Sequence, residues 1–333
     1  DSEQVRIRIG DAEASVPVDT LVDDDDAGGR HNVPGILATL RQADVGLLTL
    51  AMLLIAPIYP IQMVRWWILM RARDIEVTLG KTFRLVMVGS FFNYCMPGTT
   101  GGDLVKAYYA AKNSDRRADA VMSVIFDRIA GLFGLIVLAA VVGLFMLHDP
   151  TARMTTIYIW ALTAALILGG MVYFSNRLRR MFGLERIIAL LPGELVAKID
   201  QAAVAYRHHK AAGLNAVLLG VVVHLCIAIS TAIAGYALGM DVSLGLLLTV
   251  VPVLFLAASI PITPQGLGVM EGLAFVLLLD PPMVTKNHLV GMLLLARVFQ
   301  ILYSMTGSLF LLKGDIHMHP ARDAAPDTTP QSA

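Results

Sequence analysis

Long apolar runs constrain the fold of this chain more than any other feature of its 333 residues. A helix needs about 20 apolar residues to cross a hydrocarbon core of about 30 Å. Such runs lie at 45–64, 120–147, 154–174, 214–237 and 288–312, with a marginal further run at 244–260. Only 16% of the residues are charged, against about 25% in soluble domains. The sequence therefore predicts an all-α, polytopic transmembrane helical bundle with six full spans.

The distribution of basic residues predicts the orientation of these spans. Lysine and arginine gather in the stretches 65–84, 106–117 and 177–210. By contrast, 148–153 carries only Arg153, and 238–243 carries no basic residue. The positive-inside rule places the three basic stretches in the cytoplasm and the two poor ones outside. We therefore expect a multi-pass protein of the cell membrane.

Two other apolar stretches are interrupted by glycine and proline. The first, 82–96, runs into Pro97 and then reaches Gly101 and Gly102, while the second, 262–279, begins ITPQGLGVMEG. Basic segments flank the first stretch, and its 15 residues reach only about 22 Å as a helix, so both of its ends are expected in the cytoplasm. Broken helices at membrane depth are tolerated only where they line a cavity or pack inside protein. We predict two re-entrant elements that meet near the bilayer centre, as at the substrate sites of transporters.

Asp103 stands at the end of the first interruption. It follows Gly101 and Gly102, which makes it a candidate helix N-cap, and Lys106 lies one turn later on the same face. A glycine-rich turn that enters a helix also presents free N–H groups to a phosphate. Two interpretations stay open here: a phosphate cradle, or a capped helix start without a ligand.

Four ionisable residues lie in or near apolar segments: Asp127, Arg128, Glu271 and Arg297. Such residues are costly in lipid and usually face a bundle interior or a polar cavity. Glu271 is the expected partner of Arg297, in a pair that either serves a substrate or only fixes the helix register. Asp127 and Arg128 are adjacent and point about 100° apart on a helix, so they are expected to have different partners. We expect Arg128 near the cytoplasmic end, where it contacts a lipid phosphate or extends to the interface.

The polar segment 1–44 precedes the first span. Its start alternates apolar and polar residues around Gly10 and Asp11, which predicts a small β-hairpin. The acidic run 23–26 is interpreted as a solvated loop, with a calcium site as the weaker alternative. The first residue is Asp1 and not methionine, so we expect that an upstream helix or signal sequence has been removed. Segment 1–44 would then lie outside the cytoplasm.

Two more polar segments follow. The stretch 185–212 is amphipathic and is predicted to lie as a cytoplasmic helix on anionic lipid, and 313–333 is predicted to be a disordered tail.

No phosphate-loop, zinc-protease, nucleophile-elbow or paired-cysteine motif is present, so no cofactor, metal or catalytic residue is predicted. The formal net charge of zero gives no reason to expect a nucleic acid partner.

Four stretches together resemble a known family. RWWILMRA, VGSFFNYCMPGTTGGDLVKAYY, FDRIAGLFGL and IPITPQGLGVMEG are similar to the lysylphosphatidylglycerol synthase transmembrane region, over about residues 40 to 312. The resemblance implies a flippase-like transmembrane domain at 45–312 that stands alone, without the soluble aminoacyl-transfer domain. It implies a substrate site made of Asn93, Pro97, Gly101, Gly102, Asp103, Arg128, Pro261, Gly266, Gly268, Glu271 and Arg297. Lys106 joins the predicted substrate site because it lies one turn after Asp103. Asn93, four residues before Pro97, is expected to bond the carbonyls that the break leaves free.

Two functions remain after these observations. The favoured one is a lipid translocator in which a polar groove lined by Asp103, Arg128, Glu271 and Arg297 carries the headgroup. The partner would be an anionic or aminoacylated phospholipid, or a polyprenyl-linked substrate, and a homo-oligomer is compatible with the sequence. The alternative is a membrane-embedded transferase, or the membrane half of one, with Asp103 or Glu271 as general base. A scaffold for partner proteins is disfavoured, because charges buried at two backbone breaks are costly.

Overall fold

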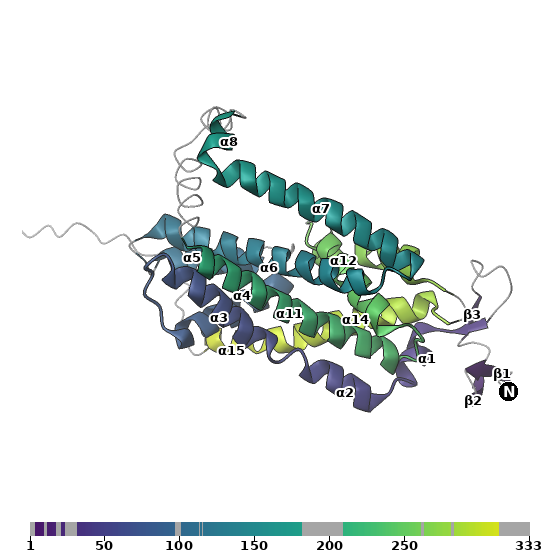
Figure 1. Ribbon diagram of the computed structural model, residues 1–333. Coiled ribbons are helices and arrows are strands. Elements are labelled where there is room, and N and C mark those ends of the chain that lie inside the picture. Colours follow the sequence, from purple (N-terminus) through teal and green to yellow (C-terminus); the bar gives the residue numbers. More distant parts are fainter. Residues whose placement is uncertain are drawn as a thin grey trace, which may run out of the picture.

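The computed structural model describes residues 4–9, 12–17, 21–23, 32–96, 101–112, 114, 116–181, 209–260, 263–280 and 283–312. Figure 1 shows a bundle of helices that run mostly along one common axis. The first half contains α1 Ile36–Arg41, α2 Val45–Leu53, α3 Ile58–Arg71, α4 Leu79–Cys95, α5 Gly101–Lys112, α6 Arg117–Phe145, α7 Pro150–Phe174 and α8 Asn176–Met181. The second half contains α11 Lys210–Ala237, α12 Leu244–Ala258, the 3₁₀ turn η4 Pro264–Gly266, α13 Val269–Leu278, α14 Lys286–Met305 and α15 Gly307–Leu312.

Five helical segments are long and apolar enough to cross a membrane among the residues described. They are Val45–Arg71, Arg117–Phe145, Pro150–Tyr173, Lys210–Ala237 and Lys286–Leu311. These segments confirm the predicted transmembrane helical bundle.

The prediction of six full spans is wrong at 244–260. Helix α12 has 15 residues, which reach about 22 Å and fall short of a bilayer core. The helix ends at Ala258 because Pro261 disfavours a helical conformation in the residue before it.

Helix α11 organises the core of the bundle, since it contacts α2, α3, α6, α12 and α14. Small residues let it approach α6 closely: a Cβ atom added at Gly134 would lie 2.5 Å from the carbonyl carbon of Gly220. Such close backbone contacts are a common basis of helix packing in membranes. The largest fully buried side chains include Trp66, Leu254 and Met292, which come from three different helices.

Helices α4 and α5 form an antiparallel pair around the first interruption. Gly102 at the start of α5 lies beside Asn93 and Gly89, and Lys106 lies beside Gly89 one turn further on. The chain therefore reverses direction between the two helices, as a re-entrant element requires. Whether the pair enters and leaves the membrane on one side stays a prediction.

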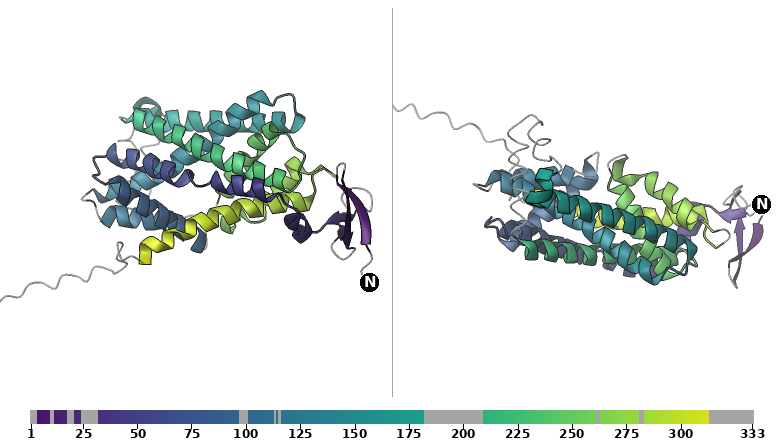
Figure 2. Two further views of the ribbon diagram at one scale, coloured as in Figure 1. Left: turned by 90° about the horizontal axis from the view of Figure 1, so that it is seen from below. Right: turned by 45° about the horizontal axis from the view of Figure 1, so that its top comes forward.

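The N-terminal strands lie at one end of the bundle and α8 lies at the other (Figure 1), and both views in Figure 2 place the strands beyond the same end. Strand β1 Gln4–Ile9 pairs antiparallel with β2 Ala12–Pro17, in agreement with the alternation in the sequence. Strand β3 Leu21–Asp23 pairs with β4 Asn32–Pro34. The boundaries of the polar segments and the sides of the membrane on which they lie stay predictions.

Several predicted features fall outside the described residues. They are most of the acidic run 23–26, nearly all of the amphipathic stretch 185–212 and the tail 313–333.

Candidate functional site

Asp103 occupies the first turn of α5. The helix begins at Gly101, so Asp103 is its third residue and the predicted N-cap role is wrong. The carboxylate remains near the positive end of the helix dipole, which stabilises its charge. It also pairs with Lys106, whose Nζ lies 3.8 Å from Asp103 Oδ1, as the spacing predicts.

Asn93 joins the two interrupted segments. Its side-chain oxygen accepts a hydrogen bond from the Gly102 N–H at 2.8 Å, and its backbone carbonyl accepts one from Gln265 Nε2 at 2.5 Å. The breaks after α4 and after α12 are thus in direct contact, as predicted, while their depth in a membrane stays a prediction. Among the described residues the Asn93 side chain accepts from Gly102; that it also bonds the carbonyls left free by the break stays a prediction.

The second break has an unusual backbone. Gln265 has φ +55° and the flanking Gly266 and Gly268 have φ +66° and +82°. Left-handed φ values are uncommon outside glycine and cluster at functional sites, where the surrounding structure holds the strain. A Cβ at Gly266 would overlap Ala258, so this glycine also allows η4 to pack against the end of α12.

Five charged side chains form a continuous network that we call the charge cluster: Arg65, Asp103, Lys106, Asp127 and Arg128. Arg65 Nε donates to Asp127 Oδ1 at 2.7 Å, and the other Asp127 oxygen lies 3.7 Å from Lys106 Nζ. Lys106 in turn contacts Asp103, whose second oxygen accepts from Arg128 Nη1. Asp127 and Arg128 therefore have different partners, as their adjacent positions predict.

The charge cluster has a buried end and a more exposed end. Arg65, Lys106 and Asp127 are only 6%, 5% and 4% exposed, whereas the side chains of Arg128 and Asp103 are 30% and 23% exposed. Arg128 lies about 16 Å from the start of α6, so it stands well inside the helix and not at its end as predicted. The three cations exceed the two carboxylates, which gives the cluster a formal charge of +1.

Sequence reasoning missed Arg65. It follows the apolar run 45–64 directly and was therefore grouped with the basic residues of a cytoplasmic loop. Helix α3 continues to Arg71, and Arg65 shares a face with the buried Leu69 four residues later. The four-residue spacing between Arg65 and Leu69 was therefore the sequence signal that Arg65 faces the interior of the bundle.

Lys106 is also held by neutral groups. Its Nζ lies 5.5 Å from the centroid of the Trp66 ring, in range of a cation–π contact. The Trp66 indole N–H is fixed by a hydrogen bond of 3.0 Å to Ser123 Oγ. The Trp66 ring is therefore held in position against the Lys106 ammonium group.

Glu271 and Arg297 form a second ion pair beside the second break. Arg297 Nη1 donates to Glu271 Oε1, which confirms the predicted pairing. The other Glu271 oxygen accepts the Gly268 N–H at 2.8 Å and so caps α13. Arg297 Nε in this pair and Thr263 Oγ1, six residues before α13, are buried and have no hydrogen-bond partner among the described residues. Buried polar groups are rarely left without a partner, which makes both atoms candidates for contact with a polar ligand.

The model of the lysylphosphatidylglycerol synthase TM region matches residues 30–307 of the chain. The chain belongs to this family. The matched segment contains both breaks, the charge cluster and the Glu271–Arg297 pair, so the resemblance seen in four stretches of sequence is confirmed. The chain matched none of the curated proteins and none of the solved structures.

In this lysylphosphatidylglycerol synthase TM region, two predicted site residues, Pro97 and Pro261, fall outside the described residues. The others are divided between two groups. The group at the first break contains Gly101, Gly102, Asp103, Lys106 and Arg128. The group at the second break contains Gly266, Gly268, Glu271 and Arg297, and Asn93 lies between the two groups. The described part contains no set of three His, Cys, Asp or Glu side chains arranged for a metal ion.

Asn93→Ala is expected to lower the free energy of unfolding by about 1 kcal/mol, because Gly102 loses the acceptor of its first-turn N–H. Asn93→Asp retains an acceptor at this position and should recover most of that loss. Unfolding titrations of the two variants in mixed micelles measure the difference. Equal losses in both variants would contradict a capping role for Asn93.

Proposed function

We propose that the protein moves a phospholipid, or another lipid-linked headgroup, between the leaflets of the membrane. The observation that carries this proposal is the charge cluster, which has more cations than carboxylates and sits at a backbone break inside an apolar bundle. An anionic headgroup in a region of low dielectric constant needs cationic or N–H partners. The more exposed end of the cluster, at Arg128, supplies one.

Asp103 acts in this proposal as a replaceable counter-ion. Its carboxylate accepts a hydrogen bond from the Arg128 guanidinium. A lipid phosphate can replace this carboxylate, because arginine binds phosphate and carboxylate groups with the same bidentate geometry. When Arg128 changes partner, Asp103 still contacts Lys106, which Asp127 also stabilises. The Arg128–Asp103 ion pair is thus replaced by a pair between Arg128 and the phosphate, and no charge is left unpaired in the apolar interior.

The second break supplies further contacts for a moving headgroup. Gln265 ties it to the first break through Asn93, and Arg297 carries a buried N–H without a partner among the described residues. Two interrupted segments around one site are typical of transporters, in which broken helices line the substrate path. A headgroup that leaves Arg128 therefore has a second polar region next to it.

The transferase alternative has less support in the geometry. A general base has to accept a proton from a substrate within hydrogen-bond reach. Both oxygens of Asp103 contact cations, at Lys106 and Arg128. Both oxygens of Glu271 are also engaged, by Arg297 and by the Gly268 N–H.

A leaflet-exchange assay with fluorescent phospholipids in proteoliposomes tests the proposal. We expect the wild-type protein to exceed protein-free vesicles and Arg128→Gln to be slower by about tenfold or more, because a hydrogen bond to a charged group contributes about 1.5–3 kcal/mol. Arg116→Gln is the matched control, since Arg116 forms an exposed ion pair with Asp74 and exposed pairs contribute little. Asp103→Asn removes the competing carboxylate, so we expect it to retain more bound anionic lipid while exchange slows.

Exchange equal to that of empty vesicles for anionic, zwitterionic and aminoacylated lipids would contradict a translocator. The same membranes should then be analysed for a chemically modified lipid, which is the product that the transferase alternative requires.

A further inference from the structure

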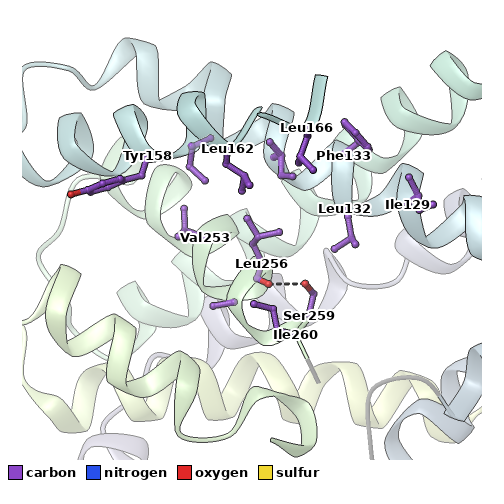
Figure 3. Close-up of a pocket in the computed structure, with 13 residues that line it drawn as sticks. Ile129, Leu132, Phe133, Tyr158, Leu162, Leu166, Val253, Leu256, Ser259 and Ile260 are labelled. Carbon is purple, nitrogen blue, oxygen red and sulfur yellow. Dashed lines mark hydrogen bonds between the residues drawn. The ribbon is translucent and has the colours of Figure 1, made fainter. Parts of the chain in front are cut away.

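An apolar groove of about 580 Å³ lies between α6, α7 and the end of α12. Figure 3 shows its side chains, which come from three helices and converge on a common space. Representative lining residues are Ile129 and Phe133 of α6, Leu162 and Leu166 of α7, and Leu256 and Ile260 at the end of α12. Within each of these pairs the residues are four apart, so each helix presents one face to the groove.

The wall of the groove offers almost nothing polar to a ligand. Ser259 is one of its few polar residues, and its hydroxyl donates to the carbonyl of Leu256 at 2.6 Å. The lining of the groove combines buried residues, such as Ile136 and Ile159, with exposed ones, such as Tyr158, Ile129 and Ile260, so the groove is open to its surroundings. Its volume falls within the range of about 300–1,000 Å³ that is usual for small-molecule sites.

Two exposed residues of the groove, Ile129 and Ile260, lie close in the chain to the two polar elements. Ile129 directly follows Arg128, the exposed cation of the charge cluster. Phe133 lies about 6 Å beyond Ile129 along the axis of α6. On the other wall, Ile260 precedes Thr263 by three residues in the chain, and Thr263 carries a buried hydroxyl without a partner among the described residues. A phosphate at Arg128 would therefore have a hydrocarbon-lined path next to it.

We infer that this groove binds one hydrocarbon chain of the lipid whose phosphate pairs with Arg128, and that the chain is a phospholipid acyl chain. The inference rests on the proposed function. Three observations support it: the groove is concave and apolar, the Ser259 hydroxyl in its wall is already bonded, and its lining residue Ile129 directly follows Arg128 in a cluster of formal charge +1. An isoprenoid phosphate has the same two parts, a phosphate and a hydrocarbon chain, and the experiment below distinguishes the two sources.

The physical effect of the groove is selectivity more than affinity. Lipid tails are about as apolar as leucine, so a chain that moves from the bilayer into the groove gains little from the hydrophobic effect. What the groove adds is a fixed shape, and a chain that overfills a well-packed apolar site is disfavoured. It also holds the chain in place while the headgroup exchanges partners at Arg128.

Photo-crosslinking tests the groove independently of transport. The probe is phosphatidylglycerol with a diazirine in the middle of one acyl chain, added to proteoliposomes that hold the full chain, and crosslinked residues are mapped by mass spectrometry. We expect crosslinks on the facing walls of α6, α7 and α12 that excess unlabelled phosphatidylglycerol removes. A polyprenyl phosphate carrying the same diazirine forms the second arm.

Leu162→Trp and Leu168→Trp provide a matched pair on α7. Leu162 lines the groove and is 38% exposed, whereas Leu168 is 63% exposed and does not line it. We expect Leu162→Trp to lose crosslinking and leaflet exchange by about tenfold and Leu168→Trp to keep both. Ala257→Phe fills the groove from α12 and should repeat the loss, so the result does not depend on the folding of one variant.

Each outcome separates the groove from the proposed function. If the wild type exchanges lipids, but crosslinks spread over the lipid-facing side of α7 and Leu162→Trp behaves like Leu168→Trp, the groove inference is overturned and the translocator stands. If competed crosslinks map to the groove without any exchange, the groove stands and the translocator fails. If the polyprenyl phosphate probe crosslinks to the groove in a way that excess unlabelled lipid removes, and the phosphatidylglycerol probe does not, the acyl-chain assignment is overturned.

Discussion

Asp127→Ala is expected to lower the free energy of unfolding by about 3–5 kcal/mol, the usual result when one partner of a buried ion pair is removed. Asp127 is the carboxylate that both Arg65 and Lys106 contact, at 2.7 and 3.7 Å. All three residues are nearly inaccessible to solvent. Without Asp127, three buried or half-buried cations share the single carboxylate of Asp103, and the formal charge of the cluster rises from +1 to +2.

Asp119→Ala is the control for this prediction. Asp119 pairs with Arg73 near the start of α6, where both side chains are more exposed than Arg65 and Asp127, so its loss should cost less than the loss of Asp127. Denaturant titration in mixed micelles compares the two variants. Equal losses would mean that water reaches Asp127 and that the charge cluster is not buried in the folded protein.

A double variant separates stability from function. Replacing Arg65 and Asp127 together by leucine removes a charge pair and leaves no unpaired partner, and such replacements of buried pairs are often neutral or stabilising. We expect the double variant to recover much of the stability lost in Asp127→Ala. Lys106 then keeps only Asp103 as a counter-ion, so Asp103 is held more firmly and leaflet exchange should still fall.

The fold was predictable where its cause lies within one stretch of sequence. The length of the apolar runs determines the long helices, and glycine with proline marks both breaks. The Glu271–Arg297 pair was predictable because an isolated charge in an apolar segment requires a partner, and each of these two residues was the nearest candidate for the other.

The rest depends on contacts that one stretch of sequence does not contain. Arg65 and Asp127 are 62 residues apart, and Arg65 stands at the boundary between an apolar run and a basic stretch. The side chain of Asn93 was expected to bond the carbonyls that the break leaves free, and the position of α5 was needed to show that the Gly102 N–H is its donor. The groove was not predictable for a further reason: α7 and α12 are largely apolar around their circumference, so no amphipathic pattern indicates which of their faces meets α6.

Gly102→Ala is expected to have the second large effect, because it forces two backbones apart. A Cβ atom at Gly102 would overlap the carbonyl oxygen of Gly89 and would lie 2.6 Å from its carbonyl carbon and 2.7 Å from Asn93 Cγ. Rigid main-chain atoms cannot turn aside as the end of a side chain can, so α4 and α5 have to separate. Overpacking of this kind costs about 1–3 kcal/mol, and the separation also breaks the hydrogen bond from Gly102 to Asn93.

A graded series of alanine variants on these two helices distinguishes packing from function. Gly89→Ala places its Cβ 2.9 Å from the Cγ and Cε atoms of Lys106 and 3.1 Å from the Gly102 carbonyl oxygen. This backbone contact is milder than the overlap in Gly102→Ala, so stability should fall less while the Lys106 contacts to Asp103 and Asp127 are displaced. Gly80→Ala meets nothing within 4 Å and should leave both properties unchanged. We expect stability to be lowest in Gly102→Ala and leaflet exchange to be slow in both Gly102→Ala and Gly89→Ala. If Gly89→Ala exchanged lipids at the wild-type rate, Lys106 would have no part in transport, and the exchange of ion pairs at Arg128 would need another explanation.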